Sequence, residues 1–260
     1  LVKEFIYFSQ VEDGVLQTGN FRGSYRSSKI ITFHKHFDRI EVRQENTSYY
    51  FDPESPLSLA ENANINTPIL ASLEIKAKEG EDSIFLISGD ALFLSEKISM
   101  IKPPSRPGSK SALGKLSSSK TKITDFNNYP ENLEVIVDYV YDNANPSVRA
   151  SALTDSRYIT VGYRHALMQM PEDGFIPRQD DARIGFCMTQ VNDMTSTELT
   201  PWKDMIHRWR LEKKDSSAAL SEPIKPITWW IENTTPYEFR DYIKTGVEKW
   251  NLAFEKIGFK

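Results

Sequence analysis

The sequence predicts an α+β fold, with a β-rich N-terminal region and a strand followed by a long helix near the C-terminus. Residues 133–142 and 159–167 each alternate apolar and other residues, as expected for strands with one buried face. Two runs between residues 73 and 88 flank a glycine-containing turn, which is typical of a hairpin. Apolar residues recur every three or four positions from residue 236 to 257, which predicts an amphipathic helix.

Composition sets broad limits on function. The chain has 260 residues, of which 39% are hydrophobic, enough for one large or two ordinary domains. A net charge of −4 gives no reason to expect nucleic acid as a partner. No apolar run approaches the length of a transmembrane segment. Cys187 is the only cysteine, so an internal disulfide is excluded.

The first hundred residues contain several short elements. β-branched and aromatic residues predict strands at 29–37 and 39–43. Ser55 is a good N-cap residue and Pro56 a good first helical residue, so we expect a short helix over 56–63. The hairpin pairs 73–77 with 83–88 through the turn at 79–82, and Asp90 could cap a short helix ending at Leu94.

Residues 102–122 differ in composition from their neighbours. Three prolines, two glycines and a run of serines interrupt any periodicity, and six Lys or Arg residues occur without an acid. We expect a flexible, solvated loop. A basic patch that binds nucleic acid or an anionic surface is the weaker alternative, because no aromatic residues are interleaved for base stacking.

The C-terminal elements have the clearest signals. Residues 227–232 alternate as a strand does, and a helix is expected over 236–257. Thr235 and Glu238 have the spacing of a capping box, and Gly258 can end the helix in the left-handed conformation. The helix should carry one apolar stripe. We expect this stripe to pack on the strand at 227–231 and the N-terminal region, on a second copy of the chain, or on a separate part of a larger parent protein. Its residues are Phe239, Ile243, Val247, Trp250, Phe254 and Ile257.

No residue can be assigned to catalysis or to a metal. A zinc helix of the His-Glu-x-x-His type places two imidazoles on one face beside a general base, and no histidine here begins that motif. His34 and His36 could share a strand face, but an exposed face is the more common arrangement. His165 lies on an apolar strand face, as a hydrogen-bonded core histidine does, and His207 belongs to an arginine-rich cluster. We expect Cys187 to be a buried, inert thiol.

Two segments place arginines beside acids or aromatic residues, where guanidinium groups can pair or stack. We interpret them as an ion-pair network between domains, with a substrate clamp as the alternative. The candidate residues are Arg178, Asp181, Arg183, Arg208, Trp209 and Arg210.

These two segments, with others, resemble a family of large secreted bacterial zinc-dependent metalloproteases of the metzincin type. The C-terminal similarity lies in Pro-Arg-Gln-Asp-Asp-Ala-Arg-Ile-Gly-Phe at 177–186, Arg-Trp-Arg-Leu-Glu-Lys at 208–213, Pro-Ile-Lys-Pro-Ile at 223–227 and residues 247–259. Residues 50–56, 69–73 and 93–95 resemble that family's N-terminal domain of unknown function. The resemblance covers nearly the whole chain and is weakest over 102–122.

The resemblance implies a β-rich N-terminal domain over 1–221 and the opening strand and helix of a metzincin-like peptidase domain over 222–260. It implies no cofactor in this chain and zinc in the full-length parent, whose zinc-binding helix comes later. The expected partners are the remainder of the peptidase domain and the parent's protein or peptide substrate, with self-association through the C-terminal helix also open. The expected location is the periplasm, the cell surface or the medium. The alternative function is a non-enzymatic, prosegment-like module that packs on a peptidase and controls access.

Overall fold

The computed structural model describes residues 3–80, 84–102, 111–172 and 174–260. The chain divides into two compact units. The first unit comprises Leu1–Asp173 and Val191–Trp202, and the second comprises Gly174–Gln190 and Lys203–Lys260. The boundary expected between Ser221 and Glu222 falls within the second unit and stays a prediction.

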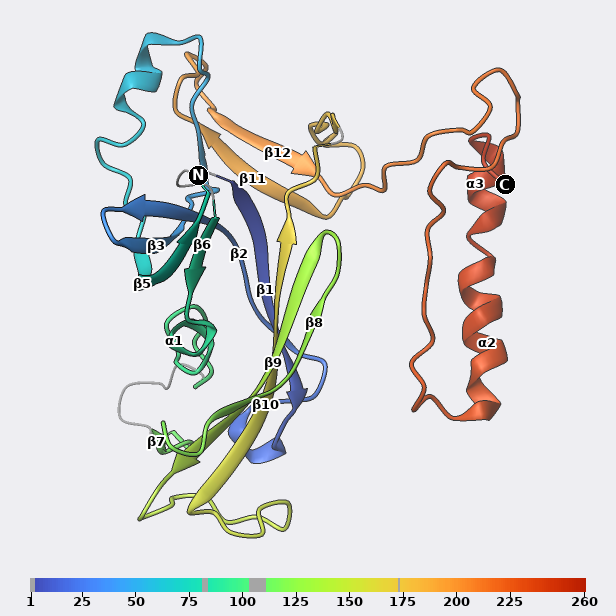
Figure 1. Ribbon diagram of the computed structural model, residues 1–260. Helices are drawn as coiled ribbons and strands as arrows, with labels where there is room; N and C mark the ends of the chain where they lie inside the picture. The colour runs from blue at the N-terminus through green and yellow to red at the C-terminus, as the bar shows by residue number, and fades with distance from the viewer. Residues whose placement is uncertain (1–2, 81–83, 103–110, 173) are drawn as a thin grey trace. The chain divides into compact units, whose positions relative to one another are not determined.

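The first unit is built on a curled antiparallel sheet (Figure 1). Its strand order is β6-β5-β3-β2-β1-β10-β9-β7, and β8 also pairs with β9. The strands are β1 (Glu4–Asp13), β2 (Tyr25–His36), β3 (Arg39–Gln44), β5 (Ile69–Glu79), β6 (Ile84–Ile87), β7 (Lys115–Leu116), β8 (Lys122–Asn128), β9 (Asn132–Asp142) and β10 (Tyr158–Gln169). A short helix, η1 (Leu16–Thr18), follows β1. The β-rich character and the C-terminal helix agree with the predicted α+β class.

The alternation along β9 and β10 is confirmed. The two strands pair in antiparallel register, with Val137 opposite Tyr163. Every second side chain on each strand points into the interior of the curled sheet, because successive strand residues face opposite sides. The buried residues are Val135, Val137, Tyr139 and Tyr141 on β9, and Ile159, Val161, Tyr163 and His165 on β10.

The other N-terminal predictions are confirmed with small changes. Strands β2 and β3 cover the two predicted segments, and β5 with β6 forms the predicted hairpin. Residues 81–83 of its turn lie outside the described residues. The helix expected over 56–63 is a shorter 3-10 helix, η2 (Pro56–Ala60), capped by Ser55 as predicted. Helix α1 (Gly89–Phe93) is capped by Ser88 rather than Asp90, because the Ser88 hydroxyl accepts from the Ala91 amide.

The segment expected to be a loop is partly built into the sheet. Residues 103–110 lie outside the described residues. Beyond them, Leu113 is buried in the core and β7 pairs with the end of β9. Thr121 is also buried, and its hydroxyl accepts a hydrogen bond from the Val140 amide at 3.2 Å. The composition of this segment predicted a loop because the few residues that pack in the core are separated by serines and lysines, which hide the pattern of a buried segment.

Three short strands form a second sheet in the order β12-β11-β4. They are β4 (Tyr49–Tyr50), β11 (Met188–Asp193) and β12 (Trp202–Ile206). The pairing of β11 with β4 is parallel and places Asn192 opposite Tyr49. The chain passes from the second unit to the first within β11 and returns to the second unit within β12, whereas β4 belongs to the first unit.

The second unit contains two consecutive helices, α2 (Tyr237–Glu248) and α3 (Asn251–Lys256). The predicted helix is therefore confirmed in extent but is interrupted at Lys249 and Trp250. Gly258 ends it in the left-handed conformation, as expected, with φ of 93°. Within the described residues, no helix combines the length and apolar character that a membrane crossing requires.

Two C-terminal predictions are wrong. Residues 227–232 form no strand and pair with no described strand. The capping box of Thr235 and Glu238 does not form, because Pro236 precedes the first helical residue and no side chain caps the helix. Arg240 instead holds this turn, donating to the carbonyls of Thr235 at 2.9 Å and Asn233 at 2.7 Å.

Candidate interaction surface

The first arginine-containing segment lies beside β12, which directly precedes the second arginine-containing segment. The Ile206 amide donates to the Arg178 carbonyl at 2.9 Å, and the Asp180 amide donates to the Asp204 carbonyl at 2.8 Å. Arg208 extends this antiparallel arrangement, because its guanidinium donates to the Ile176 carbonyl at 2.8 Å. The backbone therefore brings together two segments that are about thirty residues apart in the sequence.

Two of the candidate arginines form ion pairs with acidic residues two positions away in the sequence. Arg183 pairs with Asp181 at 2.5 Å, and the hydrogen bond from Arg183 holds the pKa of Asp181 below its usual value. Arg210 pairs in the same way with Glu212 at 2.8 Å. Such pairs between exposed side chains contribute little to stability.

The remaining candidates contact aromatic rings. The Arg208 guanidinium lies 4.4 Å from the ring centre of Phe175, and that of Arg178 lies 5.8 Å from Phe186. Trp209 meets Trp229 edge to face at 6.4 Å. These contacts order the second unit internally. The interpretations as an interdomain network or a substrate clamp both stay predictions.

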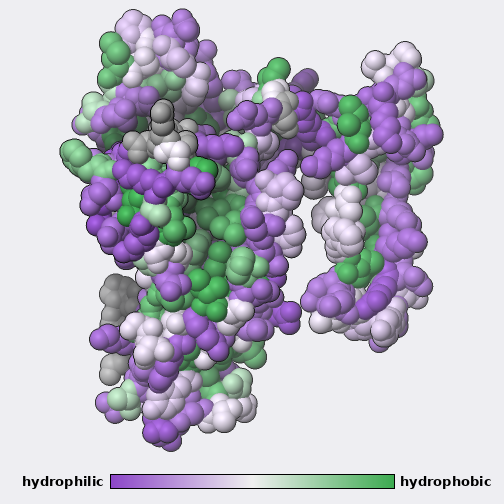
Figure 2. All heavy atoms as spheres, viewed as in Figure 1, coloured by the Kyte–Doolittle hydropathy of each residue, from purple (hydrophilic) through white to green (hydrophobic). Residues whose placement is uncertain are grey.

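The second unit exposes large apolar side chains instead of burying them. No residue of α2 or α3 is buried within the chain, so burial of the helical stripe by a second copy or by another part of the parent stays a prediction. Figure 2 shows hydrophobic residues at the surface of this unit. We call the following set the C-terminal apolar surface: Trp229, Trp230, Phe239, Ile243, Trp250 and Ile257, each at least 43% exposed.

Tryptophan is concentrated in this part of the chain. All five tryptophans lie between residues 202 and 250, and each is more than half exposed. Tryptophan is enriched among the residues that dominate binding energy in protein interfaces.

The first unit buries a chain of polar side chains, of which only His165 was predicted from the sequence. Tyr139 donates from its hydroxyl to the Phe93 carbonyl at 2.5 Å, and the same oxygen lies 2.9 Å from Nε2 of His165. Since the hydroxyl proton is already used, Nε2 must carry the hydrogen and donate it. Nδ1 of His165 then accepts from the Tyr7 hydroxyl at 2.8 Å.

Burial fixes the charge state of this histidine. It lowers the pKa of His165 to about 3, so the imidazole is neutral, in agreement with one donating and one accepting nitrogen. Burial also raises the pKa of Tyr7 and of Tyr139, so both hydroxyls keep their protons. The prediction that His165 is a hydrogen-bonded core residue is confirmed.

Tyr139 and four further side chains hold residues 93–102, which we call the core strap, across the interior of the curled sheet. Ile98, Ser99 and Ile101 of the strap are almost fully buried. These buried hydrogen bonds could have been inferred from the sequence, because the inward positions of the strands hold tyrosine, which carries a hydroxyl, rather than phenylalanine or leucine. The contacts to the strap are Tyr139 to Phe93, Tyr141 to Glu96, Lys29 to Ile98, Ser9 to Ser99 and Tyr163 to Ile101.

The remaining candidates show no catalytic or metal arrangement. Cys187 is exposed, so the expected burial is wrong: it precedes β11 in a segment with little packed around it. His34 approaches the Thr32 hydroxyl at 3.0 Å, and His207 approaches that of Thr189 at 2.7 Å. In the part of the chain that the structure describes, no three His, Cys, Asp or Glu residues are grouped to hold a metal.

Comparison with known proteins gives one match. No curated protein and no solved structure matches the chain significantly. A family model described as "Domain of unknown function (DUF5117)" matches residues 23–214, which covers most of the curled sheet and both arginine-containing segments. The chain therefore belongs to the DUF5117 family.

Proposed function

We propose that this chain is a non-catalytic part of a zinc-dependent metalloprotease, and that its second unit docks on the remainder of the peptidase domain. In this proposal the larger polypeptide hydrolyses peptide bonds and supplies every zinc ligand. The resemblance of residues 177–259 to secreted bacterial metalloproteases supports this choice of partner. It also supports a location in the periplasm, at the cell surface or in the medium.

The observation that carries the proposal is the C-terminal apolar surface. Monomeric proteins rarely expose contiguous apolar patches larger than a few hundred Å² without a binding role. Each large apolar side chain contributes about 1.5–3 kcal/mol when it becomes fully buried. Docking of this surface would therefore stabilise the second unit substantially.

The unpaired segment 227–232 supports the same proposal. Ile227, Trp229 and Ile231 alternate with more polar or exposed positions, yet the segment pairs with no described strand. Its backbone amides and carbonyls are available to form hydrogen bonds with a neighbouring strand. In this proposal the segment becomes a strand only on docking and then, together with α2, packs onto the sheet of the peptidase domain.

The test compares the chain alone with a polypeptide that also contains the residues following it in its gene. We expect the longer polypeptide to bind one zinc ion and to cleave an unfolded protein substrate, and the chain alone to do neither. Zinc is measured by elemental analysis of untagged protein. Tight stoichiometric zinc on the chain alone would contradict the proposal and turn attention back to His34 and His36.

The alternative is a prosegment-like module that packs on a separate peptidase and controls access to it. The same exposed surface supports this function, because a docking face does not reveal whether its partner is on the same polypeptide. The downstream coding sequence distinguishes the two. A His-Glu-x-x-His motif there favours the first proposal, and its absence leaves only the second.

A further inference from the structure

The loop between β9 and β10 forms a hollow at one end of the curled sheet. It encloses about 600 Å³, a size within the range of small-molecule sites. Its lining is mainly polar, and the donors that line it include Asn145, Arg149, Thr154, Ser156 and Arg157. The hollow lies wholly within the first unit and is remote in sequence from the C-terminal apolar surface.

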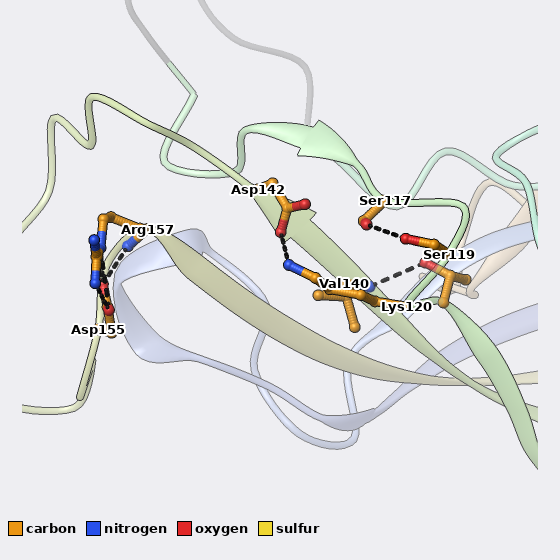
Figure 3. A network of polar contacts seen from close by, with 8 residues as sticks. Ser117, Ser119, Lys120, Val140, Asp142, Asp155 and Arg157 are labelled. Carbon is orange, nitrogen blue, oxygen red and sulfur yellow. Dashed lines mark hydrogen bonds and ion pairs between the residues drawn. The ribbon is translucent and has the colours of Figure 1, made fainter.

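The acids near this hollow are already neutralised (Figure 3). Asp155 pairs with Arg157 at 2.6 Å, and the amide of Arg157 also donates to the Asp155 carboxylate at 2.9 Å. Asp142, at the end of β9, pairs with Lys120 at 2.9 Å. Each carboxylate is thus matched by its own cation, and neither remains to repel an incoming anion.

An aromatic ring holds the two cations in place. Lys120 lies 4.3 Å from the ring centre of Tyr158, and the guanidinium of Arg157 lies 5.4 Å from it. These contacts restrict the conformations of both side chains. Binding near Arg157 would therefore cost less side-chain ordering than binding to free surface cations.

Arg149 supplies the uncompensated charge. Among the described residues, its guanidinium makes neither an ion pair nor a hydrogen bond. It lines the same hollow as Thr154 and Ser156, whose hydroxyls can also donate hydrogen bonds. A guanidinium and hydroxyl donors that line one hollow offer the kind of hydrogen bonds that a carboxylate or phosphate group accepts.

We propose that this hollow binds a small oxyanion or the carboxylate end of a peptide, with Arg149 as the main charged contact. The inference does not depend on the proposed peptidase function. Acetate and inorganic phosphate serve as probes for free anions. A short peptide with a free C-terminus, compared with its amidated form, probes for a peptide carboxylate.

The test is a titration of the full chain at constant ionic strength, followed by the NMR shifts of amides between residues 144 and 157. We expect saturable shifts with at least one probe and a loss of affinity of about tenfold in Arg149→Gln. Arg22→Gln, which removes another exposed arginine of the first unit, should leave binding unchanged. Arg149→Lys should retain part of the affinity.

The titration separates the sources of the ligand. Saturation by phosphate or acetate alone assigns a free anion, whereas preference for the free peptide terminus over its amide assigns a peptide. Absence of saturable shifts with every probe would overturn the proposal. Equal loss of affinity in Arg149→Gln and Arg22→Gln would also overturn it, because it would show non-specific charge attraction.

Discussion

Tyr139 occupies the centre of the polar contacts inside the curled sheet. Its hydroxyl joins the core strap, through the Phe93 carbonyl, to His165 on the neighbouring strand. A buried polar group costs free energy when its hydrogen-bond partner is removed, because water cannot replace the partner. The stability of the strap should therefore depend on individual hydroxyl groups.

Replacing Tyr139 with phenylalanine removes both hydrogen bonds while keeping the ring. We expect the free energy of unfolding to fall by about 1–3 kcal/mol, because the Phe93 carbonyl and the Nε2 hydrogen of His165 lose their partner. Urea unfolding of the first unit measures this change. The matched variant Tyr25→Phe, at a position 73% exposed, should change stability by less than about 0.5 kcal/mol. Equal effects of the two variants would contradict the assigned hydrogen bonds.

His165 should also make stability depend on pH. The unfolded state takes up a proton near pKa 6.5, whereas the folded state resists it until about 3. Between these values the unfolded state binds more protons, so stability falls as pH falls, by at most about 1.4 kcal/mol per pH unit. The side chains packed against His165 are Tyr7, Tyr139, Tyr163 and Phe93, none of which is charged in this window.

The pH dependence is measured by urea unfolding across this window. His165→Gln can donate and accept but cannot titrate, so we expect it to flatten the decline. Asp155 contributes separately and at lower pH. Its hydrogen bonds to Arg157 hold its pKa at about 2, so its effect begins only as pH falls through the ordinary value of 3.8. An unchanged slope in His165→Gln would contradict the neutral buried histidine.

Among the elements, alternation predicted β9 and β10 well because each strand has one buried and one less buried face. The same pattern at 227–232 led to a wrong prediction. Alternation records which side chains need burial, but it does not show whether a partner strand is present. The tendency of a segment to form a strand depends on its own residues, whereas its pairing into a sheet depends on residues elsewhere in the protein.

The capping box failed for a related reason. Thr235 and Glu238 have the required spacing, but Arg240 reaches the carbonyls of the same turn, and Pro236 adopts an extended conformation before α2. Several polar groups near the start of α2 compete for the same backbone partners, and the three-dimensional geometry decides which hydrogen bonds form. Sequence spacing therefore identified the start of the helix but not the interaction that holds it.

Gly246 should weaken α2 because glycine is unfavourable inside a helix. A Cβ built there meets no atom within 4 Å, so Gly246→Ala should stabilise the helix by about 0.5–1 kcal/mol. Gly23 also has open space, but its φ is 82°, so Gly23→Ala should be destabilising. Circular dichroism during thermal unfolding compares the two. Stabilisation by both, or by neither, would contradict the backbone conformations described here.

For the whole molecule, the sequence predicted many of the elements in their order, whereas the domain boundary after Ser221 and the interdomain role of the candidate arginines stay predictions. Asp181 with Arg183, and Glu212 with Arg210, pair within their own segments. Residue types show which pairs are possible, whereas backbone geometry decides which pairs form. The exposure of the helical stripe could not be predicted either, because an apolar stripe has the same sequence whether covered or uncovered.

Substitution of Trp250 tests whether this side chain contributes to the stability of the chain alone or only to docking. It is 68% exposed, so Trp250→Ala should change the unfolding free energy of the chain alone by less than about 0.5 kcal/mol. Ile31→Ala, in the core of the first unit, should cost about 2–5 kcal/mol. A loss of several kcal/mol in Trp250→Ala would show that this side chain is already buried in the free chain.

The most direct test of docking is hydrogen–deuterium exchange of peptides covering residues 227–257. It is measured in the chain alone and in the longer polypeptide that continues through the following residues of the gene. We expect 227–232 to exchange quickly in the chain alone and to become strongly protected in the longer polypeptide, together with α2. Peptides from β9 should exchange equally in both. Equal exchange of residues 227–257 in the two proteins would contradict the proposal that this surface docks on the rest of a peptidase domain.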